Sequence, residues 1–353
     1  MSADVEELEL LRDATRGFLE RHHQPAAVRA QLEGPRTLDR DAWRRAAEMG
    51  WIAAAVPELG GGVTQLAAIA PELGRATFPG PFLGCATAAT LLSGATGARA
   101  AELLGALGDG TRTAALAVDA GSAEPGAAAS VALDDGGRLS GELAVLADAD
   151  VADVLLVPRA TGLAHAVAAD APGVSVRPAR GLDLTRRVAT VTFDGTPAGP
   201  GLGLADGALR RALAVGATLA VADALGAAER LLELTVDYVG QRIAFGRPIG
   251  SYQAVKHKCA DMLCWVDGTR VAVDAAAAAL DGPDADAADA AVSVAKAYGA
   301  DACARVAGEA LQLHGGVAFT WEHDLHLLLR RIKADEVLFG DIARHERRLA
   351  ARI

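Results

Sequence analysis

The order in which sequence patterns change along the chain constrains its fold most strongly. Apolar residues with helical spacing run from about residue 5 to residue 110. Short apolar runs alternating with turn signals follow over roughly residues 113–193. Long helical patterns return after a Gly/Pro-rich stretch at 195–207, which we interpret as a linker. Strands clustered between two groups of helices indicate separate layers or domains and argue against a Rossmann sheet.

We therefore predict a mainly α protein with a small central β domain. Its expected parts are an N-terminal helical domain (1–112), an antiparallel β domain (113–200) and a C-terminal four-helix bundle (201–353). The bundle helices are expected at residues 208–241, 252–280, 285–313 and 324–352. Short connections between long helices are typical of an antiparallel bundle.

Composition and charge argue against several functional classes. Apolar residues make up 51% of the chain and aromatic residues 4%; abundant alanine favours packed helices, although a GC-rich genome gives the same bias. A net charge of -11 without basic runs argues against nucleic-acid binding. The cysteines lack zinc spacing, and the acidic N-terminus does not resemble a signal peptide. The apolar run 212–228 contains Asp223 and predicts a buried core helix. We expect a cytoplasmic protein with no metal site and no membrane span.

One segment with chemical potential is QRIAFGRPIGSYQ, residues 241–253, between two predicted helices. Arg242 and Phe245 are three residues apart, so both could lie on one face of a helix end. A guanidinium fork suits a pyrophosphate, and a phenyl ring offers an apolar surface to an adenine or ribose. Taken alone, the segment is explained at least as well by an ordinary helix–turn–helix with a surface arginine.

A second segment is QLHGGVAFTWEHD, residues 312–324. Gly315 and Gly316 follow a predicted helix and would let the backbone approach a ligand closely. Exposed amides there could bind anionic oxygens, and Gln312 could donate to or accept from a phosphate or an adenine. A plain helix C-cap followed by a loop explains this segment equally well.

The two segments together resemble a known family. The stretches RIAFGRPIGSYQAVKHKCADM and LQLHGGVAFTWEHDLHLLLRR resemble the two C-terminal signatures of the acyl-CoA dehydrogenases. MGWIAAAVPELGGGVTQLAAIAPELGRA resembles the N-terminal helical domain of that family. The resemblance covers nearly the whole chain, is strongest in the C-terminal motifs and weakest in the middle, and matches the family's three-domain layout.

The resemblance implies an activity and a cofactor. The family removes a proton from Cα of an acyl-CoA thioester and transfers a hydride from Cβ to N5 of FAD, and an electron-transfer flavoprotein accepts the electrons. In the family, these two motifs hold the adenine end of a flavin whose ring lies in the neighbouring subunit. The residues that the resemblance assigns to the ADP part of FAD are Arg242, Phe245, Gln253, Gln312, Gly315 and Gly316.

The chain departs from the family at the catalytic base. The family needs a carboxylate near the substrate Cα. One family position matches residues 338–340, where Phe339 stands in place of the glutamate, and the other falls within 214–217, where no carboxylate occurs. Glu336 and Asp341 lie close to the first position and are weak candidates for a substitute, although solvated helix positions explain them better.

A second departure concerns the β domain. The family has a TEP-G-GSD-like segment and a W-I-T/S-like segment that hydrogen-bond the flavin ring. The matching stretches here are VDAGS (118–122) and LAVLADA (143–149), with neither tryptophan nor threonine. We therefore expect the ring half of the site to be missing from this chain.

These matches and departures predict a subunit that completes the flavin site of a partner. The chain resembles the short subunits of actinobacterial heteromeric (α2β2) acyl-CoA dehydrogenases of steroid side-chain degradation, which share the form FTWEHDLHL seen at 319–327. Its expected partners are an acyl-CoA substrate, a second acyl-CoA dehydrogenase-like subunit and an electron-transfer flavoprotein. One alternative is a homotetrameric acyl-CoA dehydrogenase with a relocated carboxylate; another is a non-catalytic structural subunit.

Overall fold

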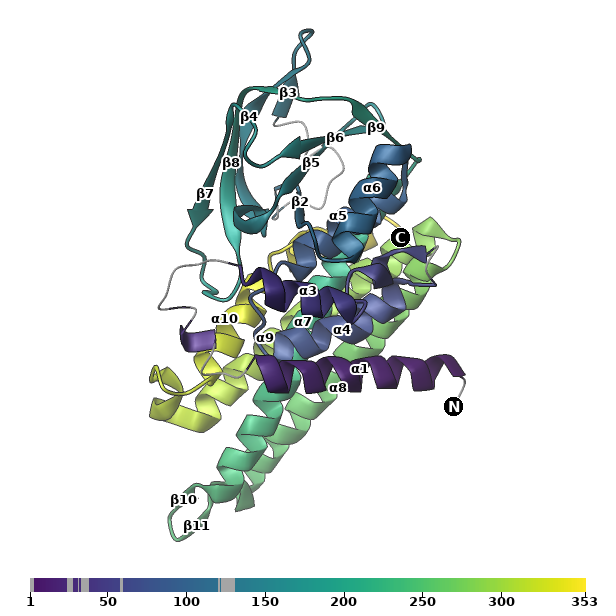
Figure 1. The fold of residues 1–353 in the computed structure, drawn as a ribbon. Coiled ribbons are helices and arrows are strands. Elements are labelled where there is room, and N and C mark those ends of the chain that lie inside the picture. The colour runs from purple at the N-terminus through teal and green to yellow at the C-terminus, as the bar shows by residue number, and fades with distance from the viewer. Residues whose placement is uncertain are drawn as a thin grey trace.

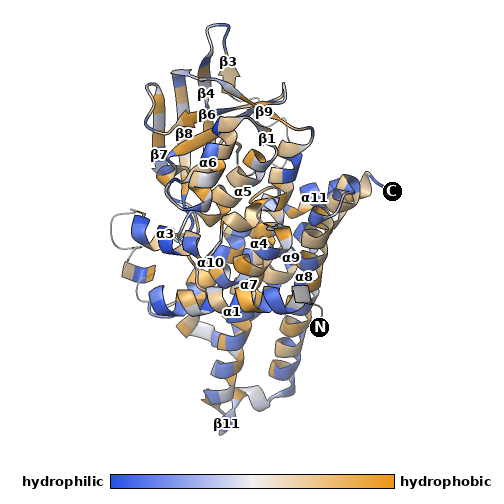
Figure 2. Ribbon diagram, turned by 45° about the vertical axis from the view of Figure 1, so that its right-hand side comes forward, coloured by the Kyte–Doolittle hydropathy of each residue, from blue (hydrophilic) through white to orange (hydrophobic). Residues whose placement is uncertain are grey.

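The computed structural model describes residues 3–23, 28–30, 32, 38–57, 60–119, 121 and 131–353. Figure 1 shows strands β2 to β9 at one end of the molecule, with the long C-terminal helices extending away from them to β10 and β11 at the other end. The N-terminal helices are α1 (Ala3–His22), α3 (Arg40–Glu48), α4 (Val63–Arg75), α5 (Phe82–Ser93) and α6 (Ala98–Gly108). Hydrophilic residues recur along α1 and α3, on the outside of this group (Figure 2).

Strands β1 to β9 form two sheets. The five-stranded sheet has the order β1-β9-β6-β5-β2, and the four-stranded sheet has the order β3-β4-β8-β7. The first sheet contains β1 (Ala95–Thr96), β2 (Ala114–Leu116), β5 (Val154–Arg159), β6 (Leu163–Ala168) and β9 (Gly201–Leu204). The second contains β3 (Val131–Leu133), β4 (Arg138–Ala147), β7 (Val174–Ala179) and β8 (Val188–Pro197). The pairs are antiparallel, as expected, except that β2 pairs parallel with β5.

The Gly/Pro-rich stretch at 195–207 is not only a linker. Its first residues continue β8, and Gly201–Leu204 forms β9, which pairs with both β6 and β1. Composition alone missed these strands because glycine weakens a strand pattern, whereas the backbone can still complete a sheet edge.

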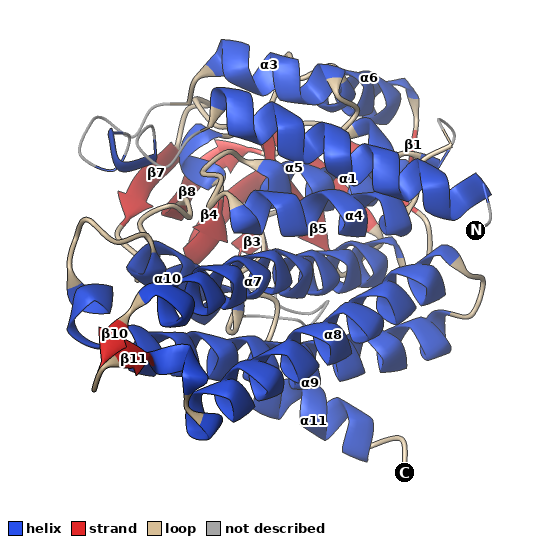
Figure 3. Cartoon of the chain, turned by 90° about the horizontal axis from the view of Figure 1, so that it is seen from below, coloured by secondary structure: helices blue, strands red, loops and turns tan. Residues whose placement is uncertain are grey.

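Three of the four predicted bundle helices are confirmed within one residue. They are α7 (Ala208–Gln241), α8 (Gln253–Asp281) and α9 (Ala285–His314), and Figure 3 shows them running side by side. The fourth prediction was wrong because residues 324–352 form two helices, α10 (Leu325–Asp335) and α11 (Ile342–Ala350). The break contains Phe339 at φ 58° and Gly340 at φ 100°, left-handed conformations that a right-handed helix cannot contain.

Helix α7 is the central helix of the fold. Among the described residues it alone is long and apolar enough to cross a membrane, and 94% of its most apolar window is buried inside the protein. It crosses α4 at glycines: a Cβ on Gly226 would stand 1.7 Å from the Pro71 carbonyl oxygen, and one on Gly74 would stand 1.9 Å from that of Asp223. This close crossing fixes α7 as the buried core helix that the sequence predicts.

Candidate functional site

A short hairpin follows the C-terminal end of α7 and projects beyond the bundle (Figure 1). Strands β10 (Ile243–Ala244) and β11 (Arg247–Pro248) pair antiparallel and leave Phe245 and Gly246 as a two-residue loop. Both loop residues have positive φ, 52° and 81°, the combination that a type I′ turn requires. The hairpin therefore presents the Phe245 side chain at its tip.

Arg242 and Phe245 do not share a helix face, so that part of the sequence prediction is wrong. Helix α7 ends at Gln241, and Arg242 is extended, with φ -68° and ψ 115°. Phe245 is 96% exposed and lies in a conformation that bulky residues seldom adopt. A large apolar side chain held outward by a strained turn indicates a role outside the core of this chain.

The base of the hairpin is held by its own side chains and backbone. The Arg247 guanidinium lies 4.0 Å from the centroid of the Tyr252 ring, and the Tyr252 hydroxyl donates to the Ala244 carbonyl at 3.4 Å. The Ile249 amide donates to the Arg242 carbonyl at 2.8 Å. These contacts fix the orientation of the hairpin relative to the start of α8.

The second segment lies at the C-terminal end of α9. Helix α9 ends at His314 and is followed by the 3-10 helix η6 (Gly315–Phe319). Gly315 has φ 61° and ψ -140°, a conformation open to glycine. A Cβ built on Gly315 or Gly316 would have no atom within 4 Å. The backbone here faces open space, so a ligand could approach it closely.

A stack of rings packs the end of α7, just before the first segment, against the second segment. Tyr238, near the end of α7, stacks on His314 with ring centroids 4.5 Å apart, and His323 meets His314 edge-on at 5.0 Å. Burial lowers the pKa of His314, whose Nδ1 lies 2.8 Å from the Ala310 carbonyl oxygen. Sequence spacing did not connect these rings, because they lie on three separate elements. The stack places both segments at one end of the bundle.

The predicted cofactor residues are exposed to solvent. All six residues are exposed: Arg242, Phe245, Gln253, Gln312, Gly315 and Gly316. Exposed apolar side chains recur in both segments, with Phe319 75% and Trp321 41% exposed in the second. A cation, two amide side chains, open backbone and an aromatic ring suit the ADP part of a dinucleotide. The donor set therefore fits that half of FAD.

The two stretches that the resemblance matches to the catalytic base, 338–340 and 214–217, lie against each other. Phe339 is buried, and its Cε1 atom lies 2.5 Å from the position that a Cβ on Gly216 would take. Ala214 and Ala217, on either side of Gly216, are also buried. A phenyl ring thus packs on a glycine where the two stretches matched by the resemblance meet. The sequence supplied both positions but not their contact, which needs the turn between α10 and α11.

The candidate substitute carboxylates both have structural partners. Glu336 forms an ion pair with Lys333, one turn earlier on α10. Asp341 is exposed and caps α11, accepting from the Arg344 amide at 2.8 Å. A role for either carboxylate as a relocated base stays a prediction.

Buried polar side chains hold the turn that carries Phe339. Lys296, on α9, donates to the Asp335 carbonyl at 2.5 Å and to the Glu336 carbonyl at 3.2 Å. His345, on α11, lies with Nε2 3.1 Å from the Phe339 carbonyl oxygen and with Nδ1 3.3 Å from the Ser293 hydroxyl.

The protonation of the two basic groups follows from their burial. Burial lowers the pKa of Lys296 to about 8 and that of His345 to about 4. His345 is therefore neutral at neutral pH. Its Nε2–H must donate to the carbonyl, while Nδ1 accepts from the Ser293 hydroxyl.

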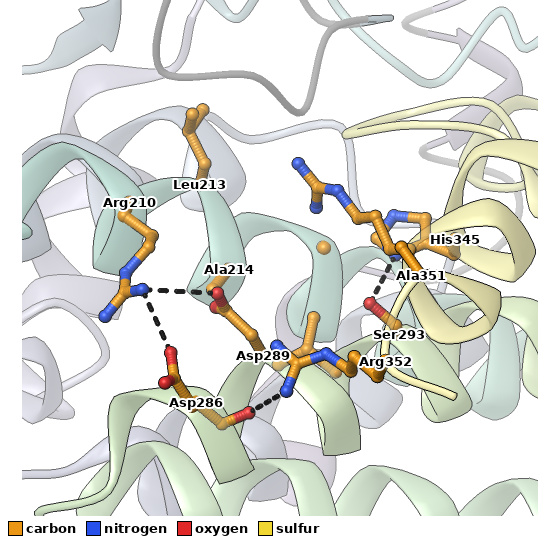
Figure 4. Close-up of a pocket in the computed structure, with 12 residues that line it drawn as sticks. Arg210, Leu213, Ala214, Asp286, Asp289, Ser293, His345, Ala351 and Arg352 are labelled. Carbon is orange, nitrogen blue, oxygen red and sulfur yellow. Dashed lines mark hydrogen bonds and ion pairs between the residues drawn. The ribbon is translucent and has the colours of Figure 1, made fainter.

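A cleft of about 470 Å³ opens beside this turn, between α7, α9 and α11 (Figure 4). Leu213, Ala214 and Ala217 give it an apolar side. Arg210 faces two carboxylates across the cleft, at 3.4 Å from Asp286 and 3.6 Å from Asp289. The cleft thus combines an apolar wall with charged groups at its edge.

A buried ionic network anchors the β7–β8 connection to the bundle. Arg331 makes two bonds to the Asp223 carboxylate, at 2.8 and 2.9 Å, and Arg186 lies 3.1 Å from Asp223 and 3.0 Å from Asp335. Burial raises the pKa of Asp335 well above its usual value. Burial acts the same way on Asp223, but Arg186 and Arg331 outweigh it and keep the pKa of Asp223 low. Asp223 is thus an anchoring residue within the apolar run of α7.

The stretches matched to the flavin-ring contacts lie partly outside the described residues, which omit 120 and 122–130. Leu143 and Leu146 of β4 are buried in the core between the sheets. Asp148 is buried and accepts from the Gly84 amide at 2.8 Å, at the start of α5, and burial raises its pKa to about 6. Within the described part of the chain, no group of three or more His, Cys, Asp or Glu could hold a metal ion.

Known proteins match the chain along almost its whole length. Residues 5–111 match the acyl-CoA dehydrogenase N-terminal domain, and residues 206–353 match the acyl-CoA dehydrogenase C-terminal domain. The chain is 33% identical to acyl-CoA dehydrogenase IpdE2 of Mycobacterium tuberculosis over 354 aligned positions, which cover 99% of this chain and 98% of that protein.

Solved structures agree with this assignment. A variant of the Tcur3481–Tcur3483 steroid ACAD is 29% identical, with a TM-score of 0.88 over 98% of this chain and 97% of that one. The ChsE4–ChsE5 complex of Mycobacterium tuberculosis is 29% identical, with a TM-score of 0.86 over 98% of this chain and 96% of that one. The helices, the small sheet domain and the C-terminal bundle form the acyl-CoA dehydrogenase fold, as the sequence predicted. The chain belongs to the acyl-CoA dehydrogenase family.

Proposed function

We propose that this chain is a subunit of an FAD-dependent acyl-CoA dehydrogenase and supplies the ADP half of the FAD site to a partner subunit. One contrast carries the proposal. The residues suited to the ADP moiety are exposed, whereas the stretches that the resemblance matches to the family base, 338–340 and 214–217, contain no carboxylate and pack together through Phe339 and Gly216. A subunit that grips a cofactor without a base can serve a reaction only together with another chain.

The residues of the two segments would divide the cofactor between them. Arg242 would pair with the pyrophosphate through its guanidinium fork, and Phe245 would cover the adenine or ribose. Gln312 and the open backbone at Gly315 and Gly316 would bind phosphate or adenine edges, with Gln253 at the start of α8 beside the hairpin. When bound, the flavin supplies the hydride acceptor for oxidation of the acyl chain.

Several observations support a partner subunit of the same family. Phe245 is exposed and strained, and contact with another chain would explain why this conformation is kept. The names of both solved relatives pair two chains, Tcur3481 with Tcur3483 and ChsE4 with ChsE5. We infer a heterotetramer in which the partner contributes the flavin-ring contacts and the base.

We infer a steroid side-chain CoA ester as the substrate. The support is that one solved relative is named a steroid ACAD, and it matches this chain along 98% of its length. An electron-transfer flavoprotein would then reoxidise the flavin, as the family assignment implies.

Expression with and without the partner tests the proposal. The chain expressed alone should carry no stable flavin, and co-expression with its partner should give a complex with a full flavin complement. Visible flavin absorbance and turnover of a CoA ester would be measured on both preparations. A yellow, active homo-oligomer from this chain alone would contradict the proposal and favour a homotetramer with a relocated base.

A further inference from the structure

We propose that the phenyl ring of Phe339 is a plug that closes this chain's own base position to an acyl-CoA thioester. The ring takes the space directly over Gly216, where its Cε1, Cζ and Cδ1 atoms come within 2.5 to 2.8 Å of the missing Cβ. An acyl chain whose α and β carbons reached this point would have to occupy the volume of the ring. The choice of acyl-CoA as the excluded ligand rests on the proposed function.

The plug stands beside an existing cleft. Leu213, which lines the cleft, lies three residues before Gly216, so by helical spacing the two are neighbours on the surface of α7. His345 also lines the cleft and contacts the Phe339 carbonyl. The cleft, the ring and the glycine thus share one region between α7 and α11.

The position of the ring is fixed, because hydrogen bonds hold the backbone of its turn. His345 donates to the Phe339 carbonyl, and Lys296 donates to the two carbonyls at the end of α10. Both side chains are completely buried, so these bonds do not compete with water. The turn is therefore a fixed wall rather than a mobile lid.

Ordinary core packing does not explain this arrangement well. A glycine inside a helix costs roughly 1 kcal/mol relative to alanine. Phe339 itself adopts φ 58°, which is unfavourable for any residue with a Cβ. A core could be filled without a glycine at 216 or a phenylalanine with positive φ at 339. The two together are needed only if a large ring is to lie over α7 at this point.

Counting ligand sites in the assembled complex tests the plug. The probe is an alkyl-CoA thioether, which lacks the thioester carbonyl and is not oxidised, titrated by calorimetry into the FAD-loaded complex with the partner. The native complex should bind a single thioether per pair of unlike chains. Phe339→Ala should open a second site, doubling the stoichiometry. The matched control is Phe193→Ala, which removes a buried ring from β8 in the β domain and should leave the stoichiometry unchanged.

Phe339→Gly serves as a second variant, since glycine accepts the left-handed backbone if the alanine variant folds poorly. A native complex that already binds two thioethers would overturn the plug. So would folded variants that keep a single site. The flavin content of the same preparations reports separately on the proposed function. The plug could be wrong while FAD still binds at the interface between the unlike chains, and FAD could be missing from that interface while the plug is right.

Discussion

Phe339 and Gly216 interlock: the phenyl Cε1 stands 2.5 Å from where a Cβ on Gly216 would be. The contact joins the turn between α10 and α11 to the middle of α7. It also brings together the two stretches that the resemblance matches to the family base, 338–340 and 214–217, neither of which contains a carboxylate. If the resemblance places the base correctly, its replacement by Phe339 is part of the packing of this region.

Substitutions of Phe339 should rank by backbone conformation as well as by size. Removing the ring leaves a cavity, and both Phe339→Ala and Phe339→Gly should lower the free energy of unfolding by about 3 kcal/mol or more. Phe339→Gly should be about 1 kcal/mol more stable than Phe339→Ala, because φ is 58° at this position. Urea unfolding of the three proteins checks the order. A more stable alanine variant would show that the left-handed backbone carries no strain.

The crossing of α4 and α7 should not tolerate a methyl group at Gly226. A Cβ there would meet the Pro71 carbonyl at 1.7 Å, so Gly226→Ala should force the helices apart and destabilise the fold by about 2 kcal/mol or more. Gly308→Ala on α9 is the control, since no atom lies within 4 Å of its Cβ position. Helix propensity predicts that this control is neutral or up to about 1 kcal/mol more stable. Equal thermal midpoints for the two variants would refute the close crossing.

Acid should weaken the turn at Phe339 through His345. Burial lowers the pKa of His345 to about 4, whereas its pKa in the unfolded chain is about 6.5. Between about pH 6.5 and about pH 4, the unfolded state is therefore protonated at His345 and the folded state is not. Stability is complete above that window and falls with falling pH, by up to about 2 kcal/mol at about pH 5.

The His345→Gln variant isolates this contribution. Its amide could still donate to the Phe339 carbonyl and accept from the Ser293 hydroxyl, but it would not titrate. Urea unfolding of native and variant protein at about pH 7 and about pH 5 should show a smaller pH difference in the variant. Identical pH differences would mean that His345 does not titrate as its burial requires.

Breaking the buried network should be far more damaging than breaking a surface pair. Arg331→Met leaves the Asp223 carboxylate short of its two closest bonds, and this should cost about 3 to 5 kcal/mol. Arg99→Met, which removes an exposed pair with Glu102, should cost less than about 1 kcal/mol. Chemical unfolding curves measure both. A loss of similar size in the two variants would show that the network is not desolvated in solution.

The sequence predicted the parts of the fold that depend on local pattern. The bounds of α7, α8 and α9 followed from helical periodicity and from the turn signals between the helices. The split of the fourth helix did not follow, because phenylalanine rarely adopts positive φ and the helical pattern continues on both sides of Phe339. Strand β9 was missed because it lies in a glycine-rich stretch, where glycine weakens the strand pattern.

At the candidate site the sequence supplied residues but not their geometry. Arg242 and Phe245 were found by their spacing, yet the hairpin that separates them depends on a type I′ turn with phenylalanine in an unusual position. The Tyr238–His314 stack, which packs the end of α7 against the second segment, involves residues far apart in the chain. Contacts of that kind are set by tertiary packing, which a local pattern does not encode.

The affinity of the assembled complex for FAD tests the central claim most directly. Apo-complexes reconstituted from the partner and either native chain, Arg242→Ala or the exposed control Arg177→Ala would be titrated with FAD, following flavin fluorescence. If this chain grips the ADP end, Arg242→Ala should weaken FAD binding by about tenfold to a hundredfold, the worth of a charge-assisted hydrogen bond, while Arg177→Ala should match the native complex. Unchanged FAD affinity in the Arg242→Ala complex would contradict the account and leave the chain a structural subunit.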